Sequence, residues 1–166
     1  MPTTNENLQI AFAGESQANR KYLAFARKAE AEGRPQIARL LRAVAEAETL
    51  HAMAHLANMG GIGSTQENLR AALAGETYEF TEMYPPMVEQ AKSENHKAHR
   101  MLGLASAAEK IHAGLFQRGL TALESGADLP AAEVYFCPIC GDVELGKPPE
   151  KCPLCGAPAS KFQLVS

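Results

Sequence analysis

The chain has 166 residues, of which 46% are hydrophobic and 21% are charged, and its net charge is −3. These values are typical of a globular protein, and without a basic block they exclude nucleic-acid binding as the expected function. No apolar run approaches the roughly 20 residues of a membrane helix, and the N-terminus has neither the basic nor the apolar region of a signal peptide. All four cysteines lie between residues 137 and 155, which argues against the dispersed disulfides of an exported domain. We therefore expect a cytoplasmic protein without membrane or nucleic-acid partners.

Residues 3–58 predict a first pair of helices. Thr3 begins a capping-box pattern, and an apolar stripe at helical spacing follows it. Gly33 can end the first helix, and Pro35 can occupy the first turn of the second. The glycine-rich stretch 60–63 ends the second helix at about Asn58.

Residues 64–126 predict a second pair of helices. Ser64 begins another capping-box pattern and opens the third helix. Tyr84 is followed by two prolines, which should kink this helix because proline lacks an amide donor and clashes with the preceding turn. A polar turn near residues 93–95 leads into the fourth helix, which ends near Gly126. The fold class expected for residues 1–126 is an all-α four-helix bundle.

Two Glu-x-x-His motifs are the strongest functional signal in the four predicted helices. Glu48 precedes His51 by three residues, and Glu109 precedes His112 by the same spacing. Residues three apart share one face of a helix, so each pair can direct a carboxylate and an imidazole at one point. Two such motifs, with a glutamate from each of two further helices, form the ligand set of a di-iron carboxylate site in a four-helix bundle.

The further glutamates occur on the other two helices. Glu15 interrupts the apolar stripe of the first helix, and Glu76 and Glu79 interrupt that of the third. One such glutamate is most simply explained by a buried salt bridge, but a group of five with two histidines needs compensating positive charge. The central turns of these stripes contain no lysine or arginine, so bound divalent cations are the better explanation. Oxygen donors with imidazole favour iron or manganese.

The last part of the chain has a different character. Residues 127–133 read as a linker, and residues 134–166 read as a small loop-rich module that needs a metal to stabilise it. Two Cys-x-x-Cys-Gly motifs, separated by eleven residues, supply four thiolates for a tetrahedral site. The ligands are Cys137, Cys140, Cys152 and Cys155. Spacing alone favours a structural zinc ribbon, whereas an iron centre for electron transfer becomes favoured only because a redox-capable di-metal bundle precedes it.

Taken together, these motifs resemble the rubrerythrin family over nearly the whole chain. The resemblance includes the segments Ala13–Ser16 and Ala74–Pro85, both Glu-x-x-His motifs and the paired cysteine motifs. It implies a ferritin-like four-helix bundle followed by a rubredoxin-like module. It also implies two non-haem iron ions in the bundle and one iron at the four cysteines, where zinc is possible in recombinant protein.

The resemblance implies a role for each ligand. Glu48 and Glu109 would bridge the two irons, Glu15 would be a terminal ligand of one iron, and Glu76 and His112 would be terminal ligands of the other. Glu79 is additional to the ordinary ferritin-like set. In the family, one iron moves between the equivalents of Glu79 and His51 as its oxidation state changes. Tyr22 is either a core tyrosine or a phenol that hydrogen-bonds to a ligating carboxylate.

The activity implied by the resemblance is that of a peroxidase for oxidative stress protection, which reduces hydrogen peroxide to water. Electrons would come from a reductase or rubredoxin through the tetrathiolate iron. A ferroxidase or oxygen-reducing protein could use the same bundle and is the main alternative. A third hypothesis is not enzymatic: a zinc-ribbon interaction protein built on a helical bundle.

A short connection predicts a homodimer with exchanged helices. The second and third helices of a ferritin-like bundle are parallel, so the chain must cross the length of the bundle between them. Residues 59–65 reach only about 25 Å when extended, whereas a helix of about 24 residues is about 36 Å long. Antiparallel neighbours would avoid the crossing. We favour exchange, in which the first two helices of one chain pack with the last two of another.

Overall fold

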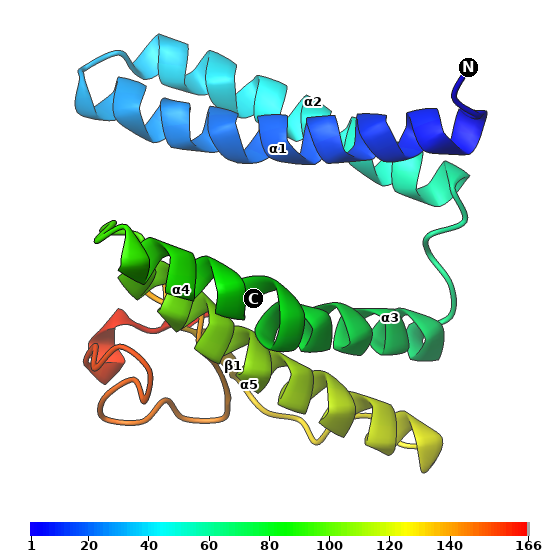
Figure 1. The fold of residues 1–166 in the computed structure, drawn as a ribbon, viewed down its shortest axis with the longest axis vertical. Coiled ribbons are helices and arrows are strands. Elements are labelled where there is room, and N and C mark those ends of the chain that lie inside the picture. Colours follow the sequence, from blue (N-terminus) through cyan, green and yellow to red (C-terminus); the bar gives the residue numbers. More distant parts are fainter. Residues whose placement is uncertain (166) are drawn as a thin grey trace. The chain divides into compact units, whose positions relative to one another are not determined.

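The computed structural model describes residues 1–165 and divides the chain into two compact units, one of them Met1–Gly63 and the other beginning at Ser64. Both units are mainly helical, and the second also contains the small module with the cysteines (Figure 1). Among the described residues, no helix has the length and apolar character needed to cross a membrane. The predicted class, a helical protein followed by a rubredoxin-like module, is confirmed.

The first unit is a hairpin of α1 (Thr4–Ala31) and α2 (Pro35–Asn58), which lie side by side in Figure 1. The predicted capping box is present, because the Thr3 side chain accepts from the Glu6 amide and the Glu6 carboxylate accepts from the Thr3 amide. Gly33 has a φ of 71°, in the left-handed region that glycine adopts most readily, so the chain can reverse there.

Alanines rather than large side chains pack this hairpin. The buried residues of its helices are Asn19, Ala26, Ala29, Ala38, Ala45 and Ala52. Side chains this small let two helices approach closely. Ile37 and Leu40 of α2 lie outside this contact, since Leu40 is 64% exposed and Ile37 is 53% exposed. The large apolar residues form a separate face that the hairpin does not cover by itself.

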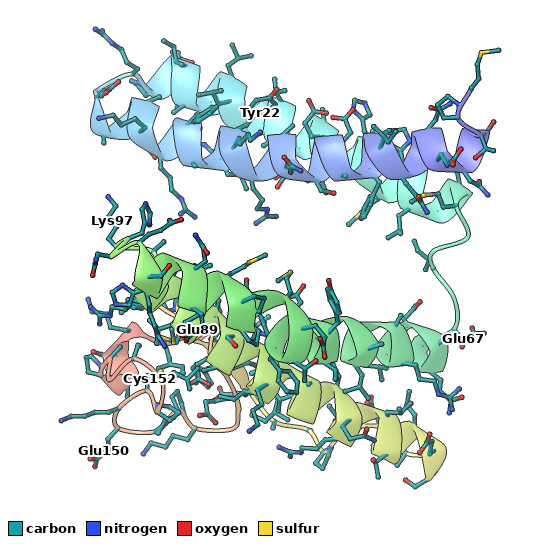
Figure 2. The ribbon with its side chains drawn as sticks, in the orientation of Figure 1. Tyr22, Glu67, Glu89, Lys97, Glu150 and Cys152 are labelled. Carbon is teal, nitrogen blue, oxygen red and sulfur yellow. The ribbon has the colours of Figure 1, made fainter. Side chains whose placement is uncertain are left out.

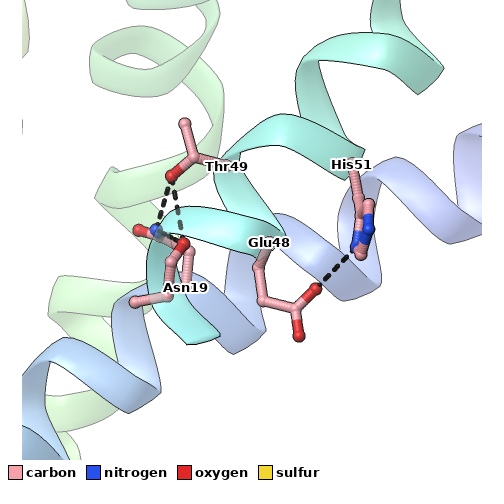
Figure 3. A network of polar contacts seen from close by, with 5 residues as sticks. Asn19, Glu48, Thr49 and His51 are labelled. Atoms are coloured by element: carbon pink, nitrogen blue, oxygen red, sulfur yellow. Dashed lines mark hydrogen bonds and ion pairs between the residues drawn. The ribbon is translucent and has the colours of Figure 1, made fainter. Parts of the chain in front are cut away.

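One polar contact joins α1 to α2 in the middle of the hairpin (Figure 3). The buried side chain of Asn19 donates from Nδ2 to the Ala45 carbonyl at 2.7 Å and to Thr49 Oγ1 at 2.8 Å. Both bonds come from the amide nitrogen, while the buried Oδ1 atom of Asn19 has no hydrogen-bond partner in the described residues. These bonds fix the register of the two helices next to Glu48.

The second unit begins with one long helical segment in three parts: α3 (Thr65–Tyr78), η1 (Glu79–Met83) and α4 (Tyr84–Ser93). The middle part is a π-helix, in which the Tyr84 amide donates to the Glu79 carbonyl. This turn lies immediately before Pro85 and Pro86, where the sequence predicts a kink. A wider turn accommodates residues that lack an amide donor, and such π segments are frequent at functional sites.

The remaining helix, α5 (His99–Glu124), packs against α3 and α4, and the chain then enters the module. Three short strands form its sheet: β1 (Val134–Phe136), β2 (Val143–Leu145) and β3 (Gln163–Leu164). The order is β2-β1-β3 with antiparallel pairing, and Phe136 lies opposite Val143. A 3₁₀ turn, η2 (Ala159–Lys161), precedes the last strand.

Both cysteine motifs fold into the same turn. The Gly141 amide donates to the Cys137 carbonyl and the Gly156 amide to the Cys152 carbonyl, each at 2.9 Å. The φ angles of Gly141 and Gly156 are 90° and 76°, in the left-handed region that other residues rarely adopt. The glycine after each Cys-x-x-Cys pair therefore permits the tight turn that closes each motif.

The module rests on one face of α5. Leu104 packs against the cysteine cluster, and a Cβ on Gly141 would lie 3.8 Å from Cβ of Ala108. One turn further along the same face, His112 makes a hydrogen bond to Gly141. Residues 104, 108 and 112 follow i, i+4, i+8 spacing, so a single stripe of the helix holds the module.

We expect Asn19→Ala to destabilise the protein by about 1–2 kcal/mol, because it removes two hydrogen bonds from a buried position. Thermal or urea unfolding of the metal-free protein measures this loss. Asn58→Ala is the matched control, since Asn58 is exposed and its side chain donates to the Ala54 carbonyl of its own helix. Its effect should stay within about 0.5 kcal/mol. Equal losses of stability for the two substitutions would contradict the role of the Asn19 hydrogen bonds in holding α1 against α2.

Candidate metal centres

The first unit carries one group of three potential metal ligands, Glu15, Glu48 and His51. One ligand atom of each residue lies within 4.8 Å of those of the other two. His51 Nδ1 is 3.0 Å from Glu48 Oε2 (Figure 3), which shows that the Glu-x-x-His spacing directs both groups to one point. The His51 side chain is 53% exposed, whereas that of Glu48 is 15% exposed.

The second unit carries a matching group, Glu76, Glu109 and His112, also within 4.8 Å of one another. His112 Nδ1 lies 2.8 Å from Glu109 Oε2 and 3.5 Å from Glu76 Oε2. Each group thus joins one Glu-x-x-His motif with one glutamate from the neighbouring helix. Each offers two carboxylates and one imidazole.

The histidines of the two groups differ in how firmly they are held. Nε2 of His112 lies 2.8 Å from the carbonyl oxygen of Gly141. A carbonyl can only accept, so Nε2 carries a proton and donates it to Gly141, which leaves Nδ1 as the ring nitrogen available to a metal ion. A backbone partner of this kind fixes the tautomer and ring orientation of a metal-ligating histidine. The contact recorded for the more exposed His51 is the one with Glu48.

Glu76 is under electrostatic strain without a cation. Burial, followed by the hydrogen bond and negative charge of Glu109, raises the pKa of Glu76 to about 7. Its Oε2 atom is buried and has no hydrogen-bond partner. A divalent cation would relieve both problems, because it supplies the positive charge and a partner for the free oxygen.

Glu79 and Tyr84 flank the second group from the π-helical segment. Glu79 belongs to neither three-residue group, although it lies near enough for its charge to act on Glu76. Burial, and then the charges of Glu109, Glu79 and Glu76, raise the pKa of the Tyr84 phenol. Tyr84 therefore lies within electrostatic range of all three carboxylates.

Tyr22 has different surroundings. Its recorded contact is with the ring of Phe25, whose centroid is 6.4 Å away at a tilt of 47°. Figure 2 shows it on the first hairpin. Its predicted hydrogen bond to a ligating carboxylate stays a prediction.

The four cysteines form a compact tetrathiol cluster in the module, where Figure 2 labels Cys152. Sγ of Cys137 is 3.6 Å from Sγ of Cys155, and Sγ of Cys140 is 3.5 Å from Sγ of Cys152. Metal–sulfur bonds of about 2.3 Å in a tetrahedron require sulfur separations of about 3.8 Å, so the cluster is nearly preformed. Burial raises the pKa of the Cys140 and Cys152 thiols, so metal binding must displace their protons.

Two features next to the cysteines are not predicted by the motifs. The Gly141 carbonyl contacts His112 across 29 residues of sequence, a separation at which no local pattern could reveal it. Asp142 is fully buried, and its Oδ2 accepts a hydrogen bond from Cys152 Sγ at 3.3 Å. The first feature depends on how the module packs against α5, and the second depends on how the module itself folds.

The donor sets fit iron in both places. Carboxylate oxygens with imidazole nitrogen suit iron in the two helical groups, and four thiolates suit a single iron or zinc in the module. The chain thus has the ligands of a ferritin-like di-metal carboxylate protein with an added rubredoxin-like centre.

Comparison with known proteins identifies the family. The rubrerythrin family model matches residues 6–120, and the model of the rubrerythrin rubredoxin-like domain matches residues 135–163. Rubrerythrin-2 of Clostridium acetobutylicum is 37% identical, with 96% of this chain and 95% of the relative covered. Nigerythrin of Nitratidesulfovibrio vulgaris is 35% identical, with 96% and 85% covered. The chain belongs to the rubrerythrin family.

Solved structures agree with this assignment. The fully reduced, all-ferrous state of nigerythrin has a TM-score of 0.59 at 33% identity, and covers 99% of this chain and 88% of its own. The partially reduced state of nigerythrin has a TM-score of 0.58 at 34% identity, with the same coverage. The resemblance predicted from the motifs is confirmed.

The raised pKa of Glu76 predicts how pH affects the metal-free protein. The folded state favours the protonated acid, so stability is lost as pH rises from 4.5 through about 7. We expect Glu76→Gln to relieve this loss, with a gain on the order of 2 kcal/mol at pH ~8 and little gain at pH ~5. Urea unfolding at both pH values measures the effect.

Glu82→Gln is the matched control, because Glu82 is an exposed glutamate on the adjoining π-helix. It should leave the pH dependence unchanged. A gain for Glu76→Gln that is equal at both pH values would contradict a strained carboxylate at this position.

Proposed function

We propose that this protein is a non-haem di-iron peroxidase that reduces hydrogen peroxide to water. The observation that carries the proposal is the contact between His112 and Gly141, because it ties an acidic ligand group directly to the tetrathiolate module. A ferritin-like site built only for iron oxidation has no need of such a link. The family assignment supports the same activity.

Six of the seven proposed ligands belong to the two groups of the structure, and Glu79 is the seventh. Glu48 and Glu109 would hold both metal ions, while Glu15, and Glu76 with His112, would be terminal ligands. Glu79 and His51 would be alternative ligands of one metal ion in its two oxidation states. The exposure of the His51 side chain supports this exchange, because a loosely held ligand can release more easily. Bound ferrous iron would supply the two electrons that the O–O bond takes up.

A phenol beside the acidic group could supply a hydrogen bond during turnover. Reduction of hydrogen peroxide takes two electrons and two protons, breaks the O–O bond and yields two water molecules. Tyr84 keeps its phenolic proton, since burial, followed by the charges of Glu109, Glu79 and Glu76, raises its pKa. Its hydroxyl would donate a hydrogen bond to an oxygen that gains negative charge.

The module would deliver the electrons. Gly141 follows the ligand Cys140 directly, and its carbonyl accepts from His112 Nε2, so a path of covalent bonds and one 2.8 Å hydrogen bond joins the two sites. Functionally, residues 1–126 would form the catalytic bundle, 127–133 the linker and 134–166 the electron-transfer module. The donor would be a reductase or a separate rubredoxin.

Stopped-flow oxidation of the diferrous protein tests the activity. We expect peroxide to oxidise it faster than dioxygen at equal concentration, and faster oxidation by dioxygen would favour the ferroxidase alternative.

Glu79→Ala tests the proposed seventh ligand. The variant should retain the fold and most of the metal but lower peroxide turnover by at least about tenfold, because it removes a ligand that would bind the metal ion in only one of its oxidation states. Glu82→Ala is the control, and unchanged turnover in Glu79→Ala would show that Glu79 is idle.

Cys152→Ser tests the relay. We expect loss of the visible absorption of the tetrathiolate iron and at least a hundredfold fall in reductase-coupled turnover. The reason is that the substitution removes one of the four thiolates that hold this iron. The chemically reduced bundle should still react with peroxide at nearly the wild-type rate. Equal coupled activity in the variant and the wild type would rule out electron delivery through the module, as would a colourless wild-type protein containing only zinc.

We further propose that the active form is a homodimer with exchanged helices. Helix α2 ends at Asn58 and α3 begins at Thr65, so the connection reaches about 25 Å, while the 24 residues of α2 span about 36 Å. The uncovered apolar face of the first hairpin, with Leu40 64% exposed and Leu50 68% exposed, also needs a partner. Glu15, Glu48 and His51 of one chain would then complete a site with the second ligand group of the other.

Mixed variants distinguish exchange from a self-contained chain. Glu48→Ala and Glu109→Ala should each be inactive alone, because each lacks a bridging carboxylate. Unfolded together and refolded as a mixture, they should recover about a quarter of wild-type activity, because half of the dimers are mixed and each of these has one intact site. Refolding each variant alone is the control. No recovery in a mixture that forms mixed dimers would contradict the exchange.

A further inference from the structure

The second unit contains a cavity of about 490 Å³ that the peroxide reaction does not use. It lies among α3, α5, the linker and strand β2, and most of its wall is apolar. Leu69, Phe116, Leu129 and Val143 represent the four segments. At one place the wall is formed by Glu76 and His112, two proposed ligands of the di-iron site. An apolar cavity with a few polar groups at one place is the usual form of a small-molecule site.

Hydrogen peroxide as the substrate does not explain the size and the apolar wall of this cavity. It is a small polar molecule, and an apolar wall offers it no hydrogen bonds in exchange for its water. An alkyl or aryl group, by contrast, binds more tightly as more of its surface leaves water. The wall therefore selects a ligand with an apolar body, and the position of Glu76 and His112 selects one with a polar head.

We propose that the cavity holds the organic part of alkyl and aryl hydroperoxides, so that the protein also reduces this class of substrate. The inference rests on the proposed peroxidase function and names a second substrate class for the same site. With the organic part in the cavity, the hydroperoxide group lies beside Glu76 and His112. The O–O bond breaks, two electrons arrive from the reductase through the module, two protons are taken up, and the products are one alcohol and one water molecule.

Leu129 allows the cavity to be altered without touching a ligand. It lies in the linker, is half-buried, and its Cδ1 would be 4.0 Å from a Cβ on Gly119 across the cavity wall. Leu129→Trp should fill the cavity. Leu129→Ala should enlarge it, and this variant is the alternative if the tryptophan substitution prevents folding. Leu164→Trp is the matched control, because Leu164 is 53% exposed on β3 and does not line the cavity.

Turnover of cumene hydroperoxide and of hydrogen peroxide by the iron-loaded full-length protein tests the proposal. We expect Leu129→Trp to lower kcat/KM for cumene hydroperoxide by at least about tenfold, as loss of an apolar pocket contact does, with hydrogen peroxide changed less than about twofold. Leu164→Trp should retain both activities, and Leu129→Ala should retain turnover of hydrogen peroxide. No turnover of cumene hydroperoxide by a wild type that reduces hydrogen peroxide would overturn this inference alone, as would equal losses for both oxidants in Leu129→Trp.

Binding of the product alcohol, 2-phenyl-2-propanol, supplies a readout that needs no iron. Calorimetry on the metal-free full-length protein should detect binding in the wild type and in Leu164→Trp, and none in Leu129→Trp. Undiminished binding in Leu129→Trp would place the ligand elsewhere and overturn the inference. An absence of binding to the wild type would also overturn it, and is the result expected if a second copy of the chain fills the cavity. Failure with both oxidants would overturn the proposed peroxidase function and the hydroperoxide assignment with it.

Discussion

The structure depends on one electrostatic constraint: carboxylates gathered on apolar helix faces need positive charge. Glu76 shows the constraint most plainly, since burial and Glu109 raise its pKa to about 7 and leave one buried oxygen without a partner. Each compact unit places two carboxylates and one imidazole within 4.8 Å. In the part of the chain that the structure describes, the ion pairs of these glutamates are with His51 and His112 and not with a lysine or arginine, so a metal cation is the partner that suits both groups.

The same constraint accounts for the way the helices are packed. The first hairpin is joined by alanines and pinned by Asn19, which leaves its acids and its large apolar side chains on other faces. In the second unit a π turn precedes Pro85 and brings Glu79 and Tyr84 near Glu76. The module then rests on α5 so that Gly141 holds His112 in the tautomer that exposes Nδ1. The alanine contact of the hairpin, the π turn and the contact of the module with α5 thus all help to position the proposed ligands.

Much of this could be predicted from residues close together in sequence. The capping boxes at Thr3 and Ser64, the limits of α2, the Glu-x-x-His pairs and the turns after the cysteines all follow from local spacing. Features that depend on distant contacts could not be predicted. The hairpin interface consists of alanines rather than the apolar stripe, the prolines produce a π turn rather than a simple kink, and the bond from His112 to Gly141 spans 29 residues. Local patterns determine which groups share a face, whereas tertiary packing determines what that face meets.

The central proposal is that the two ligand groups, one from each compact unit, act together as one dinuclear centre. Low-temperature Mössbauer spectroscopy of the fully oxidised protein, reconstituted with Mössbauer-active iron, tests it most directly. Iron ions joined by bridging carboxylates couple magnetically, so the account predicts a diamagnetic ferric pair with twice the intensity of a separate ferric tetrathiolate signal. Two independent high-spin ferric sites, each bound by one group of three ligands, would contradict it.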